Sequence, residues 1–425
     1  MVLLEHQKEA LKQTENLNRV AYYHDMGLGK TFSGAEKMIR LGAELNLLIC
    51  QKSKIQDWRN HFAEYYKYDI SAYDLTNRKQ WNDFWENPCG FRYRVGIINY
   101  ELAWRRKDLL KLRDFTLMLD ESSLIQNKNA KQTKFILKLQ PANVILLSGT
   151  PTSGKYENLW TQLHLLGWDI SEKLYQRQYV NWKTIQIPGG QYVNIVDKEN
   201  PYKNVDRLKS KMREHGATFL KTEEVMDLPE QNFIEMSISK PKHYDKFMKD
   251  SIVTVDGVEL VGDSSLTKRL CARELCGIYS EAKFEAFRDL ISSTNDRIIV
   301  FYNFTAELVE FESIANDLER PFSLVTGSCK RLDEYEQEEN SLTFVQYQAG
   351  AMGLNLQKAN KIIYYSPPER SELFEQSKKR IHRIGQEKPC FYYLMICKNT
   401  VEENIYEALQ MRRDFTDELF RECEK

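Results

Sequence analysis

Short, mostly apolar runs recur along the first half of the chain, and each is followed by a polar stretch and an amphipathic segment. The runs lie at residues 19–23, 45–50, 95–99, 115–119 and 143–147, with helical patterns between them, for example at 34–41 and 55–65. Apolar runs without alternation are typical of strands that are buried on both faces of a parallel sheet. The alternation of strands and helices predicts an open α/β sheet, in which ligands bind at the carboxyl ends of the strands.

The pattern changes between residues 154 and 228, where Trp, Tyr, Lys and Gln dominate and Pro188-Gly189-Gly190 marks a tight turn. This composition predicts a mainly helical extension of the first lobe with one small hairpin. Leu228-Pro229 ends the extension, and residues 232–239 are predicted to be extended.

The α/β pattern returns in the second half. A hairpin is predicted around Val255-Asp256-Gly257 and one helix over 266–290, followed by strands at 297–301, 322–325, 342–347, 361–365 and 390–396. These elements predict a second doubly wound lobe. The acidic run 333–339 is predicted to be a solvated helix face. The predicted domains are a first lobe over 1–153, the helical extension and linker over 154–230, and a second lobe over 231–425.

Composition agrees with a protein of several domains. The chain has 425 residues, of which 42% are hydrophobic and 12% aromatic, enough apolar material for a core in each domain. The 60 basic and 61 acidic residues give a net charge of -1. Bulk charge therefore does not favour a nucleic-acid partner, and any DNA contact would need a local basic surface.

Targeting and cysteine patterns indicate a cytoplasmic protein. The chain has no apolar stretch long enough to span a membrane, and its first residues lack the pattern of a signal peptide. None of the eight cysteines forms a Cys-x-x-Cys pair. We therefore expect reduced thiols and no zinc site, with Cys271 and Cys276 as two ordinary residues on a helix.

A candidate phosphate-binding loop follows the first predicted strand and opens a helix. Its sequence runs through His24, Asp25, Met26, Gly27, Leu28, Gly29, Lys30 and Thr31. Glycines let backbone N–H groups approach phosphate oxygens at a helix N-terminus. Lys30 would neutralise the β- and γ-phosphates, and the Thr31 hydroxyl would bind Mg²⁺. The general pattern begins with a glycine, and His24 replaces it here.

An acidic pair, Asp120-Glu121, follows the predicted strand 115–119. At the carboxyl end of a parallel strand the pair would face the phosphate loop. Asp120 would hold Mg²⁺ through water, and Glu121 would orient and deprotonate the attacking water. An acidic strand-to-helix turn is the alternative for an isolated pair.

A basic segment, residues 376–386, places Arg380 and Arg383 three positions apart. On a helix these side chains would share a face, and both guanidinium groups could contact a γ-phosphate bound across a cleft. The alternative is a basic surface that faces solvent or DNA.

Five segments in this order resemble the motifs of helicase superfamily two: residues 25–31, Asp120-Glu121, 147–152, 353–356 and 380–386. In detail they are similar to the sucrose-non-fermenting type, the ATPases of chromatin remodellers and their bacterial and phage relatives. Met-Gly-Leu-Gly-Lys-Thr, Gly-Leu-Asn-Leu and His-Arg-Ile-Gly-Gln distinguish that type. The resemblance runs from Gln7 to Gln386 and implies two RecA-like lobes that close on ATP.

The resemblance also implies roles for further residues. Gln7 would read adenine, and residues 148–150 would couple the ATP state to the grip on DNA. The implied DNA contacts are Lys52, Ser53, Asn99, Tyr100, Asn303 and Asn355, and Gly353 and Gln376 are assigned to the nucleotide site.

The chain departs from the family pattern in two places. Ser122-Ser123 follows the acidic pair where the family usually has Gly-His or Ala-His, which puts in doubt the link from hydrolysis to the motif at 147–152. The stretch 327–343 is shorter than in most remodellers, and little sequence follows Gln386. These features resemble the minimal motor core of bacteria and their phages, in the cytoplasm of a bacterial or phage-infected cell.

Together, the patterns and the resemblance predict an ATP- and Mg²⁺-dependent translocase on double-stranded DNA, including branched DNA, with no membrane partner. Two alternatives remain open: a strand-separating DNA or RNA helicase, and an ATP-gated DNA-binding scaffold with little turnover.

Overall fold

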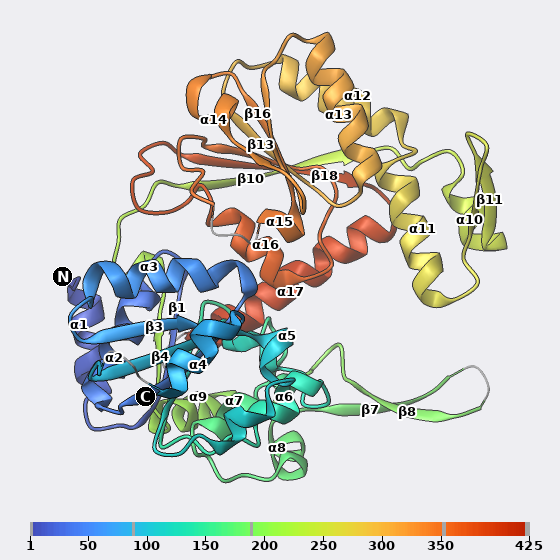
Figure 1. Cartoon of the computed structure of the whole chain (residues 1–425). Helices are drawn as coiled ribbons and strands as arrows, with labels where there is room; N and C mark the ends of the chain where they lie inside the picture. The colour runs from blue at the N-terminus through green and yellow to red at the C-terminus, as the bar shows by residue number, and fades with distance from the viewer. Residues whose placement is uncertain (1–2, 87–89, 188–189, 351–353, 421–425) are drawn as a thin grey trace. The chain divides into compact units, whose positions relative to one another are not determined.

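The computed structural model describes residues 3–86, 90–187, 190–350 and 354–420, which form two compact units (Figure 1). Unit 1 comprises Met1–Val225 and Asp414–Lys425, and unit 2 comprises Met226–Arg413. Each unit is built around its own seven-stranded sheet. None of the helices among the described residues is long and apolar enough to cross a membrane.

The sheet of unit 1 has the order β3-β4-β2-β5-β6-β1-β9, and all its paired strands are parallel. Its strands are β1 (Arg19–His24), β2 (Leu45–Cys50), β3 (Ile70–Asp74), β4 (Tyr93–Asn99), β5 (Thr116–Asp120), β6 (Asn143–Ser148) and β9 (Ala217–Leu220). The five predicted strands are confirmed. The two strands that were not predicted, β3 and β9, are the edges of the sheet. An edge strand is only partly buried, so its sequence lacks the mostly apolar run of a central strand.

Two cores flank this sheet because successive strand residues point to opposite faces. Val20, Leu48 and Ile145 pack on one face with α1, α2 and α3. Ala21, Leu47 and Leu146 pack on the other face, which α4 to α9 cover. The α-helices are α1 (Glu5–Gln13), α2 (Lys30–Leu41), α3 (Ile55–Tyr65), α4 (Arg78–Glu86), α5 (Tyr100–Ala103), α6 (Lys131–Ile136), α7 (Trp160–Leu165), α8 (Glu172–Tyr179) and α9 (Val205–Glu214). The short 3-10 helices are η1 (Lys52–Lys54), η2 (Lys107–Lys111), η3 (Ser122–Ile125), η4 (Tyr156–Asn158) and η5 (Thr222–Glu224).

The predicted extension after β6 is helical, as expected, and it carries one antiparallel hairpin. The strands of the hairpin are β7 (Trp182–Gln186) and β8 (Tyr192–Val196). They form a separate two-stranded ribbon that projects from the helices of unit 1 (Figure 1). Of the predicted turn, Gly190 is described and has φ +81°, whereas Pro188 and Gly189 lie outside the described residues.

The sheet of unit 2 has the order β10-β18-β17-β13-β16-β14-β15 and is parallel except for β15 at one edge. Its strands are β10 (Gln231–Ile238), β13 (Ile298–Tyr302), β14 (Phe322–Val325), β15 (Lys330–Arg331), β16 (Leu342–Gln346), β17 (Lys361–Tyr364) and β18 (Cys390–Cys397). The predicted strands are confirmed, and the predicted hairpin forms β11 (Ile252–Val255) and β12 (Val258–Val261). Each unit is therefore a doubly wound, RecA-like α/β sheet.

Helices cover both faces of this second sheet, with one core on each face. They are α10 (Tyr244–Asp250), α11 (Ser265–Gly277), α12 (Glu281–Ser292), α13 (Thr305–Asp317), α14 (Asp333–Gln337), α15 (Tyr347–Gly350), α16 (Ser371–Lys378) and α17 (Val401–Phe420), which begins in unit 2. The single helix predicted over 266–290 was wrong, because the helical backbone is interrupted after Gly277 and restarts at Glu281. The acidic run forms α14, whose acidic side chains are largely exposed, as predicted.

Candidate nucleotide and nucleic-acid site

The carboxyl ends of the strands in unit 1 bring together most of the residues that the sequence singled out. Because these strands are parallel, their carboxyl ends lie along one edge of the sheet. The phosphate loop follows β1, Lys52 follows β2, Asn99 ends β4, Asp120 ends β5 and Ser148 ends β6. The topology therefore assembles one site from segments that are far apart in the sequence.

The phosphate loop has the backbone that an anion requires. Gly27 has φ +89° and Gly29 has φ +72°, and left-handed values such as these strain residues with a side chain. Gly29 caps α2, which has no side-chain cap and no acidic residue in its first turn. The positive end of the helix is therefore left for a bound anion. Lys30 Nζ donates to the carbonyl oxygens of His24 at 2.7 Å and Asp25 at 3.1 Å.

Gln7 lies against the same loop. Its Nε2 donates to the carbonyl of Leu28 at 3.2 Å, and its Oε1 accepts from the N–H of Leu4 at 3.0 Å. A Cβ atom on Gly29 would lie only 2.2 Å from Gln7 Nε2, so a larger residue there would displace the Gln7 amide from the loop. The adenine-reading role of Gln7 stays a prediction, but the structure joins this residue to the phosphate loop.

The acidic pair sits at the end of β5 and is anchored by a residue that sequence reasoning missed. Trp58 Nε1 donates to Asp120 Oδ2 at 2.8 Å. Burial raises the pKa of Asp120, while the hydrogen bond from Trp58 and the charge of Lys30 act in the opposite direction. Glu121 has φ +55°, an unusual value for a side-chain residue and one that turns the chain sharply after the strand.

A buried glutamine joins the acidic segment to the segment 148–152. Oε1 of Gln162 accepts hydrogen bonds from Ser122 Oγ at 2.8 Å and from Tyr23 Oη at 3.0 Å. Nε2 of Gln162 donates to the carbonyl of Pro151 at 2.7 Å. Ser122 thus has a physical link to this motif although the usual histidine is missing. No sequence pattern points to Gln162, which lies on α7 and is far along the chain from Ser122 and Tyr23.

The predicted DNA contacts of unit 1 differ in exposure. Lys52 and Ser53 are exposed on η1, directly after β2. Asn99 and Tyr100 are buried instead. The Asn99 amide donates to Glu101 at 2.6 Å, and the Tyr100 hydroxyl donates to the carbonyl of Asp120 at 2.9 Å. In the described structure these two side chains support the edge of the site from within, and their contact with DNA stays a prediction.

In unit 2, Asn303 follows β13 and is turned toward its own unit. Its Nδ2 donates to Ser366 Oγ and to the carbonyl of Pro367, both at 2.9 Å. Glu307 accepts from the N–H groups of Asn303 and Phe304, both at 2.9 Å. Asn355 is exposed, and Gly353 lies outside the described residues.

The helix expected to carry Arg380 and Arg383 ends before them, so that prediction was wrong. α16 ends at Lys378, although Gln376 does lie on it. Both arginines lie in the series of turns that follows. Gln386 stabilises these turns, because its Nε2 donates to the carbonyls of Ala359 and Ile381 at 2.9 and 3.2 Å. Burial lowers the pKa of Arg383 from its ordinary high value. The turns therefore decide where the guanidinium groups point, and helical periodicity does not.

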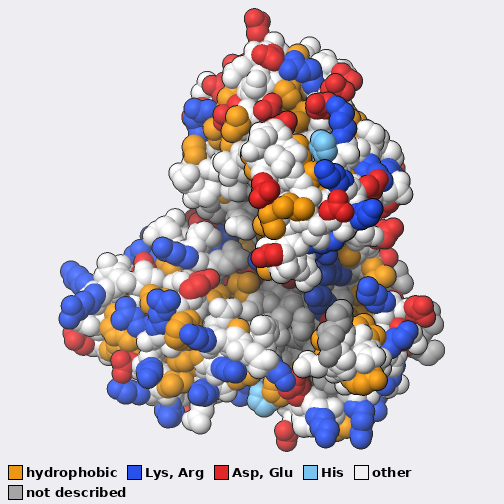
Figure 2. Space-filling view, turned by 90° about the vertical axis from the view of Figure 1, so that its right-hand side faces the viewer, with side chains coloured by type: hydrophobic (Ala, Val, Ile, Leu, Met, Phe, Trp, Pro, Cys, Tyr) orange, Lys and Arg blue, Asp and Glu red, His pale blue; other side chains and the backbone are white. Residues whose placement is uncertain are grey.

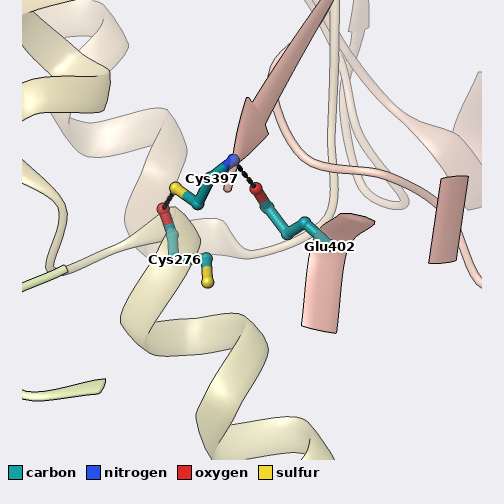
Figure 3. A group of neighbouring side chains, drawn as sticks. All are labelled: Cys276, Cys397 and Glu402. Carbon is teal, nitrogen blue, oxygen red and sulfur yellow. Dashed lines mark hydrogen bonds between the residues drawn. The ribbon is translucent and has the colours of Figure 1, made fainter. Parts of the chain in front are cut away.

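Two cysteines and a glutamate form the one buried cluster of metal-ligand type found among the described residues (Figure 3). Cys397 donates its backbone N–H to Glu402 at 3.0 Å, and its Sγ donates to the carbonyl of Cys276 at 3.8 Å. The ammonium group of Lys283 contacts both Glu402 oxygens, at 2.6 and 2.7 Å. A cation already neutralises this carboxylate, so the cluster is a packing element. Cys271 is not part of it and contacts the carbonyl of Val261.

The hydrogen-bond donors and metal ligands of unit 1 suit a nucleoside triphosphate with its magnesium ion. An uncapped helix start, a lysine and a hydroxyl at Thr31 provide for phosphates and metal, and the carboxylate of Asp120 lies in the same edge of the sheet. Gly149 also belongs here, because a Cβ atom on it would lie 3.5 Å from Lys30 Nζ.

Comparisons with known proteins place the chain among similar ATPases. It is 22% identical to the ISWI chromatin-remodeling complex ATPase ISW1 of Saccharomyces cerevisiae, over 90% of this chain and 37% of that protein. It is 23% identical to the uncharacterized ATP-dependent helicase YqhH of Bacillus subtilis, over 96% of this chain and 77% of that protein. The chain thus spans less than half the length of the yeast relative.

One similar solved structure is the Sulfolobus solfataricus SWI2/SNF2 ATPase core in complex with dsDNA, 17% identical with a TM-score of 0.45. It covers 98% of this chain and 92% of that chain. Family comparison matches the SNF2-related domain over residues 6–277 and the helicase conserved C-terminal domain over residues 282–385. With more than half of its length matched by the first of these, the chain belongs to the SNF2-related family.

Proposed function

We propose that this protein is a DNA-stimulated ATPase that moves along double-stranded DNA. The observation that carries the proposal is the edge of unit 1, where the loop of Lys30 follows β1 and the acidic pair Asp120-Glu121 follows β5, two parallel strands of one sheet with β6 between them. Family membership supports the same activity.

In the proposed reaction, Lys30 binds the β- and γ-phosphates of ATP. Thr31 and Asp120 would hold Mg²⁺, and the ion would supply positive charge against the charge that develops on the phosphates. Glu121 orients the attacking water and accepts its proton. Arg380 and Arg383 from unit 2 complete the site during turnover and stabilise the transition state. Gly353 and Gln376 serve the same nucleotide site.

The proposed DNA contacts are made mainly to phosphates, through exposed groups such as Lys52 and Ser53 and through Asn303 and Asn355. Lys and Arg side chains are interspersed with Asp and Glu on the face drawn in Figure 2, in keeping with the net charge of -1. A face with this mixture of charges would bind DNA through a few local contacts. We therefore expect weak sequence dependence and loss of binding with rising salt.

An ATPase assay with no nucleic acid, single-stranded DNA, duplex DNA, branched DNA and RNA tests the proposal. We expect duplex DNA to stimulate hydrolysis most, and Lys30→Ala to abolish it. Arg383→Ala should reduce turnover about a thousandfold while ATP binding stays within about twofold, because a phosphate-contacting arginine acts chiefly in the transition state. Normal hydrolysis by Arg383→Ala would contradict the proposed role of unit 2.

Two other activities remain as alternatives, and each has its own readout. A strand-separating helicase would displace a labelled strand of a duplex, whereas a duplex translocase displaces a triplex-forming third strand and leaves the duplex paired. An ATP-gated scaffold would bind DNA in an ATP-dependent way without DNA-stimulated phosphate release.

A further inference from the structure

A cavity of about 450 Å³ lies at the root of the β7–β8 hairpin, within unit 1. Its size falls in the range of small-molecule sites. Amide side chains dominate its wall: Gln126, Asn127, Asn129, Asn158 and Gln176. Two indole rings also line it, from Trp160 and from Trp182, the first residue of β7. A wall of amides beside an indole binds a planar polar group better than an aliphatic one.

One wall residue presents a buried acceptor. Gln176 Nε2 donates to the carbonyl of Glu157 at 2.8 Å, whereas its Oε1 is buried and has no hydrogen-bond partner among the described residues. A buried acceptor without a partner is costly, and rotation of the Gln176 amide toward the cavity would let a ligand with an N–H group relieve that cost.

The charges of the wall disfavour an anion inside the cavity. Its lysine, Lys128, is paired with Glu172 at 2.5 Å, and a second carboxylate, Glu157, accepts from the Tyr202 hydroxyl at 2.7 Å. With one cation beside two carboxylates, a phosphate would not be stabilised there. A neutral, planar group that carries N–H donors fits, and a nucleobase is such a group.

The hairpin extends this site along one face. Residues that oppose each other in an antiparallel pair share a face, which here joins Trp182 to Val196, Thr184 to Asn194, and Gln186 to Tyr192. Trp182 is 44% exposed and Tyr192 is 71% exposed. An exposed aromatic residue at each end, with hydroxyl and amide groups between them, is the type of surface on which unpaired bases stack.

We propose that the cavity and Trp182 bind an unpaired base of single-stranded DNA, with the Tyr192 face of the hairpin carrying the neighbouring nucleotides. This site deepens the proposed function, on which it rests, because it would let a duplex translocase recognise single-stranded tails or branch points. Gln126 also connects the cavity to the segment 148–152, since its Nε2 donates to the carbonyl of Pro151 at 3.3 Å and to Ser153 Oγ at 3.1 Å.

The test measures binding of the full chain, without ATP, to two fluorescent probes: a blunt duplex and the same duplex with a short oligo-dT tail. We expect the wild type to bind the tailed probe more tightly. Trp182→Ala should weaken binding of the tailed probe about tenfold or more, the loss typical of one stacked base, and leave binding of the blunt probe within about twofold. Tyr68→Ala, which removes an 83% exposed aromatic side chain elsewhere on unit 1, is the matched control and should not change the affinity for either probe.

Equal binding of the tailed probe by Trp182→Ala and wild type would overturn the proposal and leave an aromatic peptide segment as the better candidate occupant. An equal loss on both probes would also overturn it, because the hairpin would then contact duplex DNA. Gln176→Leu supplies a second readout and should weaken binding of the tailed probe but not of the blunt probe. Triplex displacement on blunt duplex tests translocation separately, so failure of either proposal is recognisable without the other.

Discussion

Ser122 Oγ donates a 2.8 Å hydrogen bond to Gln162 Oε1, and through this bond the acidic segment of the proposed ATP site is joined to the segment that follows β6. Gln162 is fully buried and completes the path by donating to the carbonyl of Pro151. The chain thus lacks the usual histidine after its acidic pair but has a buried amide in a position to connect the same two segments.

Gln162→Leu should uncouple hydrolysis from DNA. The leucine has a similar size but leaves Ser122, Tyr23 and the carbonyl of Pro151 without their partner, at a cost of about 1–3 kcal/mol in the free energy of unfolding. We expect the stimulation of ATPase activity by duplex DNA to fall about tenfold or more, with ATP affinity within about twofold of wild type. Gln132→Leu, at a partly exposed amide that donates to the carbonyl of Leu124, is the matched control. Full stimulation in the Gln162 variant would show that the path carries no coupling.

Gly29→Ala should impair ATP binding, because a Cβ atom at this position would lie 2.2 Å from Gln7 Nε2. Gly42→Ala is a strict control. Gly42 also has φ +72°, but a Cβ atom there would have no neighbour within 4 Å. Both variants carry the left-handed strain of about 1 kcal/mol, and only the first disturbs the loop. Titration with a fluorescent ATP analogue should show at least a tenfold loss for Gly29→Ala and none for Gly42→Ala. Equal affinities would mean that the Gln7 contact is dispensable.

Trp58→Phe should weaken the response to Mg²⁺. The substitution keeps an aromatic ring but removes the N–H that donates to Asp120, which allows burial to raise the pKa of that carboxyl further. Hydrogen bonds to charged groups contribute about 1.5–3 kcal/mol, so the Mg²⁺ concentration for half-maximal ATPase activity should rise about tenfold. This rise in the required Mg²⁺ concentration should be largest at acidic pH, where Asp120 is more easily protonated. If the Mg²⁺ concentration for half-maximal activity equalled that of wild type, Trp58 would have no role in the response to Mg²⁺.

Glu307 should make the stability of unit 2 depend on pH. Burial raises its pKa from the ordinary 4.5 to about 7, although the N–H groups of Phe304 and Asn303 act against the shift. A raised carboxyl pKa means that the folded state binds the proton more tightly than the unfolded state. The corresponding stability, on the order of 3 kcal/mol, is therefore fully present below about pH 4.5 and is lost as pH rises through about 7.

Chemical denaturation of wild type and Glu307→Gln across this pH range measures that contribution, because the glutamine mimics the protonated carboxyl and does not titrate. The stability of wild type relative to the variant should fall as pH rises between 4.5 and 7. A constant difference would show that Glu307 does not titrate in this range.

The sequence by itself determined the two doubly wound lobes and the position of the phosphate loop. Central parallel strands such as β2 and β5 are buried on both faces, so each appears in the sequence as a mostly apolar run. The glycines around Lys30 have left-handed backbone angles that favour glycine. Tertiary structure decided what depends on distant partners. It ended α16 before Arg380, placed Trp58 on Asp120, and brought Gln162 to Ser122. Side-chain hydrogen bonds between residues far apart in the chain leave no periodic signal, because only the fold brings their atoms within reach.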